Sequence, residues 1–134
     1  MEQVTIRLEA DVHPTESEDQ VKAAVTNIVG GANVTIQSEG HRCILTAEAQ
    51  GQDSLIKLRS ILRSDRIRDA SRKALFRSTR GNTINFCLNK QVAFVGHVSF
   101  CEETAESPLG PIHVTIAADN PQQLVEWLAE KTNR

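Results

Sequence analysis

Residues 4–12 read VTIRLEADV, and this stretch decides how the amino-terminal half of the chain folds. Apolar side chains stand at every even position from Val4 to Val12 and alternate with polar ones. This alternation is typical of a β-strand with one buried face and one face in water. The following segment, PTESEDQVKAAVTNIVGG at 14–31, carries apolar residues at helical spacing. We therefore expect a strand that is covered by a helix.

The ends of that helix have recognisable signals. Thr15 and Glu18 have the spacing of a capping box, so the helix is predicted to begin there. Gly30 and Gly31 are predicted to end it, because glycine adopts the positive φ that helix ends often require. A glycine pair can also bind phosphate. No strand leads into this pair and no lysine follows at the spacing of a phosphate-binding loop, so we favour the capping interpretation.

Short strands and amphipathic helices are predicted along the rest of the chain. A β-hairpin turns at Glu39 and Gly40, and a basic helical region begins at Gln52 or Asp53 and is interrupted at Ser64 and Asp65. A last helix begins with Asn120 as its cap and Pro121 at its first position. The segment 89–95 fits either a helical turn or a continued strand. Further strands are predicted around 34–36, 43–49, 84–88, 98–100 and 112–116.

The predicted order β-α-β-β-α-α-β-β-β-α indicates a single α+β domain over residues 1–134. We expect a two-layer sandwich, with a mixed sheet of about six strands and helices mainly on one face. A split β-α-β arrangement of the ferredoxin type is the alternative topology. Such a sheet leaves an exposed edge, which proteins commonly cover, and the proline-rich stretch Ser107–Pro111 reads as a stiff turn. We therefore predict a homodimer.

Charge is unevenly distributed along the chain. The segment from Lys57 to Arg80 holds nine basic and two acidic residues, a net charge of +7 in a chain whose net charge is −2. Such segregation indicates a polyanionic partner. The residues expected to contact it are Arg59, Arg63, Arg66, Arg68, Arg72, Lys73, Arg77 and Arg80.

Two functions fit this pattern. The first is RNA binding by phosphate contacts from the two basic helices. Aromatic residues make up only 4% of the chain and tyrosine is absent, so base stacking has few platforms. The alternative is a homodimeric protein-interaction or scaffold module without RNA-binding activity, whose basic helices meet an acidic protein. That interface needs apolar anchors beside the arginines, and only Phe76 offers one.

Catalysis, metal binding and cofactor binding are not indicated. Cys43, Cys87 and Cys101 lie on predicted strands, where a thiol behaves as a small apolar group. The pairs His41 with Cys43 and His97 with Cys101 lack the further ligands that zinc needs. We expect no enzyme activity, no cofactor and no metal. Because no signal peptide or long apolar stretch is present, we expect a cytoplasmic location away from membranes.

Several short segments together resemble one known family. LNKQ at 88–91, SFCE at 99–102 and SPLGPI at 107–112 are similar to the archaeal uncharacterised protein family 0201. The likeness extends to PTE at 14–16 and to Arg66, Ile67 and Asp69. It implies an α+β fold similar to that of the ribosomal protein that binds 5S ribosomal RNA, together with RNA binding. It carries no established site residues with it.

Overall fold

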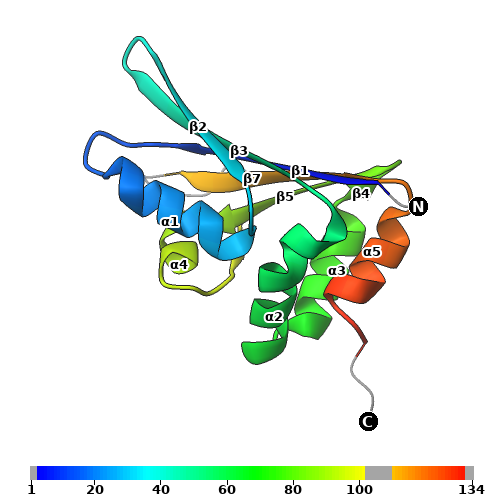
Figure 1. Ribbon diagram of the computed structural model, residues 1–134. Coiled ribbons are helices and arrows are strands. Elements are labelled where there is room, and N and C mark those ends of the chain that lie inside the picture. Colours follow the sequence, from blue (N-terminus) through cyan, green and yellow to red (C-terminus); the bar gives the residue numbers. More distant parts are fainter. Residues whose placement is uncertain (1–2, 102–109, 132–134) are drawn as a thin grey trace.

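An antiparallel sheet and a layer of helices on one of its faces make up the structure (Figure 1). This computed structural model describes residues 3–101 and 110–131. The strands follow the order β2-β3-β1-β7-β5-β4, and β6 pairs with β5 as well. Their bounds are β1 (Val4–Asp11), β2 (Asn33–Glu39), β3 (Arg42–Gln50), β4 (Thr79–Arg80), β5 (Thr83–Asn89), β6 (Phe100–Cys101) and β7 (Pro111–Ala118).

The predicted α+β two-layer sandwich is confirmed, with two differences in the sheet. Every strand pair in the described residues is antiparallel, so the prediction of a mixed sheet was wrong. β3 lies between β1 and β2, with α1 connecting those two strands. This is the split β-α-β arrangement that was the alternative topology.

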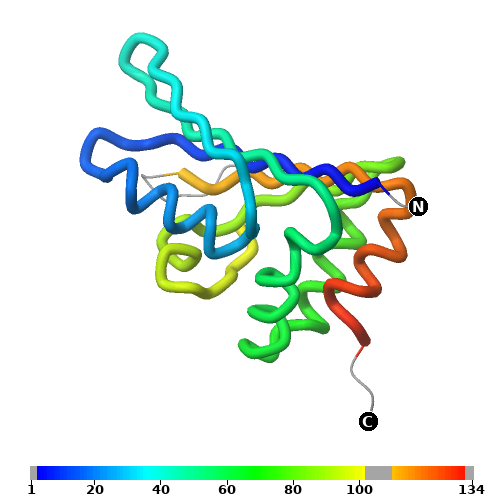
Figure 2. The backbone as a smooth tube through the Cα atoms, in the orientation of Figure 1, coloured from blue at the N-terminus to red at the C-terminus, as the bar shows by residue number. Residues whose placement is uncertain are grey.

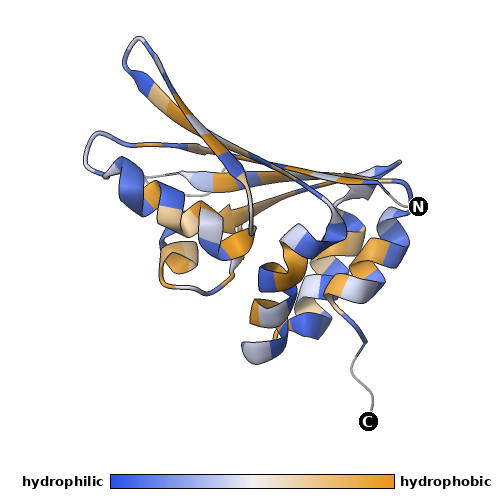
Figure 3. Cartoon of the chain, viewed as in Figure 1, coloured by the Kyte–Doolittle hydropathy of each residue, from blue (hydrophilic) through white to orange (hydrophobic). Residues whose placement is uncertain are grey.

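The alternation in β1 determines which of its faces is buried. Ile6 and Leu8 are fully buried, while Thr5 and Arg7 are exposed. The register places Leu8 opposite Ala47 on one side and Val114 on the other, so three apolar side chains form one row beneath the sheet. In Figure 3, apolar colours line the helix surfaces that face this layer.

The helices lie in two groups on the same face of the sheet (Figures 1 and 2). α1 packs with α4 beneath one end, and α3 and α2 pack with α5 beneath the other. A short 3-10 turn, η1, leads from β3 into α2. The helix bounds are α1 (Glu18–Ile28), η1 (Gln52–Leu55), α2 (Ile56–Ser64), α3 (Arg68–Arg77), α4 (Lys90–Phe94) and α5 (Pro121–Leu128).

The helix cap of α1 differs from the prediction. Ser17, not Thr15, accepts a hydrogen bond from the backbone N–H of Gln20, and Gln20 completes the capping box. Both residue pairs match the sequence pattern of a capping box, so the pattern alone does not separate them. Thr15 instead contacts Nδ1 of His13 at 2.8 Å, within the turn that precedes the helix. The helix ends at Ile28, and Gly31 supplies a positive φ of 67° beyond it.

Other differences concern short elements. β4 was not predicted, since two residues carry no periodicity, and the strand expected at 98–100 begins only at Phe100. The ambiguous segment 89–95 contains the helix α4, which Asn89 caps through the N–H of Val92. α5 begins as predicted, with Asn120 as its cap. The predicted stiff turn Ser107–Pro111 lies, except for its last two residues, outside the described part of the chain.

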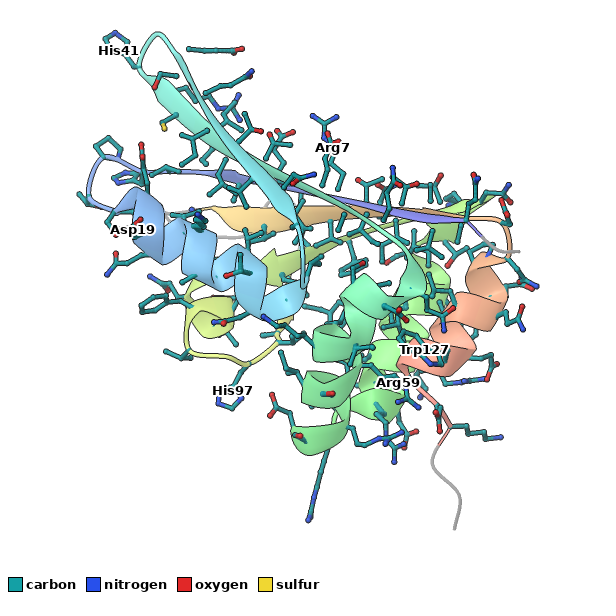
Figure 4. All side chains as sticks on the ribbon, viewed as in Figure 1. Arg7, Asp19, His41, Arg59, His97 and Trp127 are labelled. Carbon is teal, nitrogen blue, oxygen red and sulfur yellow. The ribbon has the colours of Figure 1, made fainter. Side chains whose placement is uncertain are left out.

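Among residues 3–101 and 110–131, no helix covers the second face of the sheet (Figure 1). Arg7 extends from this open face, and His41 lies at the tip of the β2–β3 hairpin, which projects past the rest of the sheet (Figure 4). Among the described residues, no helix combines the length and the apolar character that crossing a membrane requires.

Candidate nucleic-acid interface

The eight basic residues selected from sequence divide into two groups of four in the structure. The first group lies near two carboxylates, Glu126 of α5 and Glu130 just beyond the end of that helix, and it consists of Arg59, Arg63, Arg68 and Arg72. The other group forms no salt bridge with an acidic side chain in the described part of the chain. Helical periodicity predicts which side chains point away from the core. It does not predict whether such a side chain forms an ion pair with a neighbouring helix or extends into solvent.

Arg72 of α3 belongs to the first group. Its Nη1 donates to Oε2 of Glu126 at 2.7 Å, and its Nη2 donates to Oε1 of the same carboxylate. The hydrogen bond from Arg72 lowers the pKa of Glu126. The guanidinium also lies over the ring of Phe76, 5.0 Å from its centroid. Arg72 therefore connects α3 to α5 in the folded chain.

Arg59 connects α2 to the end of α5 in a similar way. Its Nε donates to the carbonyl oxygen of Trp127 at 2.9 Å, and its Nη2 donates to Glu130. Figure 4 shows Arg59 beside Trp127, and the guanidinium carbon is 5.1 Å from the ring centroid. Arg63 lies 3.6 Å from the same carboxylate. The hydrogen bond from Arg59 lowers the pKa of Glu130, and the charges of Arg59, Arg63 and Arg68 lower it further.

The second group comprises Arg66, Lys73, Arg77 and Arg80, which we call the exposed basic set. All four are exposed. Lys73 and Arg77 are one helical turn apart on α3, and Arg66 lies in the turn before α3 with a positive φ of 57°. Nη1 of Arg80 donates to the carbonyl oxygens of Arg77 and Thr79, each at 2.8 Å. Arg80 is therefore held beside the end of α3.

A cavity of about 610 Å³ opens next to Arg77. It lies where the end of α3 meets the outer edge of β5, between the two short strands β4 and β6. Phe86 and Phe100 line it, with ring centroids 5.5 Å apart. Sequence reasoning missed this cavity, because strand pairings between distant segments build it. The only signal was the pair of phenylalanines at predicted strand positions.

A smaller cavity, of about 220 Å³, lies at the other end of the molecule beside Lys90. The ammonium of Lys90 is buried, and it donates to the carbonyl oxygen of Asp11 at 2.6 Å and to Glu16 at 3.0 Å. Glu16 also accepts the backbone N–H of His13. These bonds join α4 to the turn before α1, which is a sufficient structural role for a buried lysine.

The cysteines and histidines do not gather into a metal site within residues 3–101 and 110–131. Nδ1 of His97 lies 3.0 Å from a carboxylate oxygen of Asp65. Cys101 is the register partner of Cys87, whose sulfur is 3.4 Å from Nδ1 of His113. His41 lies at the hairpin tip (Figure 4). The expected absence of a catalytic thiol stays a prediction.

Comparisons with known proteins all lead to one family. A protein-family model described as RNA binding matches residues 5–118. A UPF0201 protein of Sulfurisphaera tokodaii is 45% identical over 127 residues, which cover 95% of this chain and 88% of the relative. A UPF0201 protein of Sulfolobus acidocaldarius is 44% identical over 125 residues, which cover 93% of this chain and 86% of that relative.

The solved structures include close matches to the fold. The crystal structure of a UPF0201 protein from Methanococcus jannaschii superposes with a TM-score of 0.84 at 32% identity. The superposition covers 96% of this chain and 95% of that one. The likeness to the ribosomal protein that binds 5S ribosomal RNA stays a prediction.

Proposed function

The chain belongs to the archaeal UPF0201 family, and from this premise we propose that it binds RNA through phosphate contacts made by the exposed basic set. The observation that carries the proposal is the division of the basic residues. Arg59 and Arg72 are held by α5, whereas the side chains of Lys73 and Arg77 extend into solvent without an acidic partner in the described residues. Binding a phosphate there breaks no ion pair of the fold.

The chemistry of the exposed basic set suits a phosphate backbone. A guanidinium presents paired N–H donors that match two phosphate oxygens, and an ammonium acts as a compact positive charge. The remainder of the chain is acidic and repels RNA that approaches elsewhere, which restricts the docking face. Such contacts fix position and supply affinity without reading sequence. Structured RNA recognised by its shape is therefore the proposed ligand.

The test compares two charge-reversal variants with equal change in net charge. Lys73→Glu/Arg77→Glu alters the exposed basic set. Arg7→Glu/Lys22→Glu is the control, because both residues are exposed and lie away from the basic helices. Arg7 extends from the open face of the sheet, and Lys22 lies on α1, which packs with α4 in the other helix group (Figures 1 and 4). A labelled RNA hairpin is titrated with each protein at low salt.

We expect the α3 variant to lose at least about tenfold in affinity, while the control stays within a few-fold of the wild type. Equal losses in both variants would show that affinity follows net charge and not this surface. Failure of the wild-type protein to bind the hairpin at low salt would remove the RNA-binding proposal altogether.

Homodimer formation is a second proposal, and it concerns the opposite end of the sheet. β2 ends the strand order, and its outer side pairs with no strand in the described part of the chain. Seven residues of unpaired edge favour pairing with a second copy. Light scattering at micromolar concentration should give twice the monomer mass of 14.8 kDa. Thr35→Pro, which places a proline in β2, should then give monomers, and a monomeric wild type would contradict the proposal.

The scaffold alternative has less support from the geometry. Its expected anchor, Phe76, is half-buried, packs against the core and lies beneath Arg72. An acidic protein partner would therefore meet arginines without the apolar anchor that the interface needs.

A further inference from the structure

The cavity beside Arg77 results from an interruption in strand pairing. β4 pairs with the start of β5, where Thr79 lies opposite Ile84, and β6 pairs with its end, where Phe100 lies opposite Leu88. Between these pairs, Asn85 and Phe86 have no register partner on this edge in the described part of the chain, although the N–H of Asn85 donates to the carbonyl oxygen of Ser78 at 3.2 Å. The notch is a cavity of about 610 Å³, within the range of about 300–1,000 Å³ that is typical of small-ligand sites.

The wall on the helix side offers an aromatic surface. Phe86 is almost fully buried, whereas Phe100 is half-buried, and the two rings are tilted by 45°. Both line the cavity, so a flat ring that enters it meets an aromatic surface. Bases of single-stranded RNA stack on aromatic side chains in this way, and such stacking tolerates any base.

The wall on the open-face side offers a hydrogen-bonding group. The hydroxyl of Thr115 donates to Oδ1 of Asn85 at 2.8 Å, and this bond fixes the orientation of the amide. The amide nitrogen of Asn85 is left to donate elsewhere, since no hydrogen bond from it is found within the described residues. An asparagine amide in this position can contact the edge of a base.

The rim carries the positive charge. Arg77 lines the cavity and is also a member of the exposed basic set. A phosphate bound to its guanidinium would place the attached nucleoside at the mouth of the cavity. The same residue therefore links the surface that binds phosphates to the pocket that can receive a base.

We propose that this cavity takes one unpaired nucleotide of the bound RNA, with its base against Phe86 and Phe100, its edge at Asn85 and its phosphate on Arg77. The inference rests on the proposed RNA binding and adds a preference to it. A base inside a duplex cannot reach the cavity, because it is stacked and paired. RNA with a bulged nucleotide should therefore bind more tightly than a fully paired stem.

The test uses five RNA hairpins that share one stem. Four carry a single bulged nucleotide, A, C, G or U, and the fifth has none. For the wild-type protein, at least one bulged hairpin should bind about tenfold more tightly than the plain stem, as expected when one base stacks on an aromatic group. Asn85→Ala and Phe100→Leu should abolish this preference while the affinity for the plain stem is kept.

Thr83→Ala is the matched control, because Thr83 lies two residues before Asn85 on the same strand but outside the cavity. It should keep the preference for the bulged hairpin. Equal affinity of the wild type for all five hairpins would overturn the cavity proposal and leave the phosphate surface standing. A preference that survives both Asn85→Ala and Phe100→Leu would also overturn it. Failure to bind every hairpin would remove the proposed function, and this inference with it.

Discussion

Arg72 of α3 holds Glu126 of α5 by two parallel hydrogen bonds, with 2.7 Å between Nη1 and Oε2. Nη1 also lies 3.4 Å from the carbonyl oxygen of Ala129, just beyond the end of α5. The planar guanidinium suits such a paired contact better than an ammonium would. Arg72 was predicted from sequence to contact a polyanionic partner, but in the structure it is part of the contact between α3 and α5.

This contact predicts a dependence of stability on pH. Hydrogen bonds from Arg72 and Arg59 lower the pKa values of Glu126 and Glu130. A carboxylate whose pKa is lower in the folded state than in the unfolded state stabilises the fold above its unfolded pKa. That stabilisation is lost as pH falls through the folded pKa. We therefore expect the attachment of α5 to weaken below about pH 4.

Urea denaturation at neutral and acid pH measures this effect. Glu126→Gln/Glu130→Gln should lower the free energy of unfolding at pH 7 and should reduce its loss on acidification. If the variant and the wild type lose the same stability between pH 7 and pH 3, the two ion pairs contribute nothing.

The buried ion pair of Lys90 and Glu16 should contribute more to the free energy of unfolding than the more exposed ion pairs of Glu126 and Glu130. Lys90 is 3% exposed, so removing its counter-charge leaves an ammonium in the interior. Glu16→Met should lower the free energy of unfolding by roughly 3 kcal/mol, whereas Glu16→Met/Lys90→Met should cost less than Glu16→Met alone. Chemical denaturation of the three proteins measures both differences. A cost of Glu16→Met below about 1 kcal/mol would show that the pair is not important for stability.

The start of α1 offers a comparison between neighbouring residues. Ser17→Ala removes the side chain that accepts the N–H of Gln20 and should lower the free energy of unfolding by about 1 kcal/mol. Thr15→Ala is the matched change, and it should cost less because Thr15 caps no backbone N–H of the helix. Thermal denaturation of the two variants measures the difference, and a larger loss for Thr15→Ala would show that Thr15, and not Ser17, caps the helix.

Much of the fold could be predicted from local patterns. The alternation of β1 and the apolar stripe of α1 each span several residues, and a buried face imposes the same period on the sequence. Elements defined by pairing alone could not be predicted. β4 has two residues, and it exists because Thr79 lies opposite Ile84 once α3 has packed beneath the sheet.

The candidate site could be predicted only in part, for a related reason. Charge density located α2 and α3 correctly, since exposed arginines mark a helix face that avoids the core. It could not show that Arg59 and Arg72 meet Glu130 and Glu126, because those residues lie more than fifty positions further along the chain. The cavity was missed because Arg77, Phe86 and Phe100 come together only through tertiary packing.

The dependence of RNA affinity on salt tests the central claim most directly. Four phosphate contacts release roughly 0.7–0.9 counterions each, so affinity should fall about fifty-fold or more between about 50 and 200 mM salt. Lys73→Gln/Arg77→Gln should reduce the slope of log affinity against log salt by about 1.5, and Arg7→Gln/Lys22→Gln should leave it unchanged. A wild-type affinity without this salt dependence, or an equal slope in Lys73→Gln/Arg77→Gln, would contradict binding by the exposed basic set.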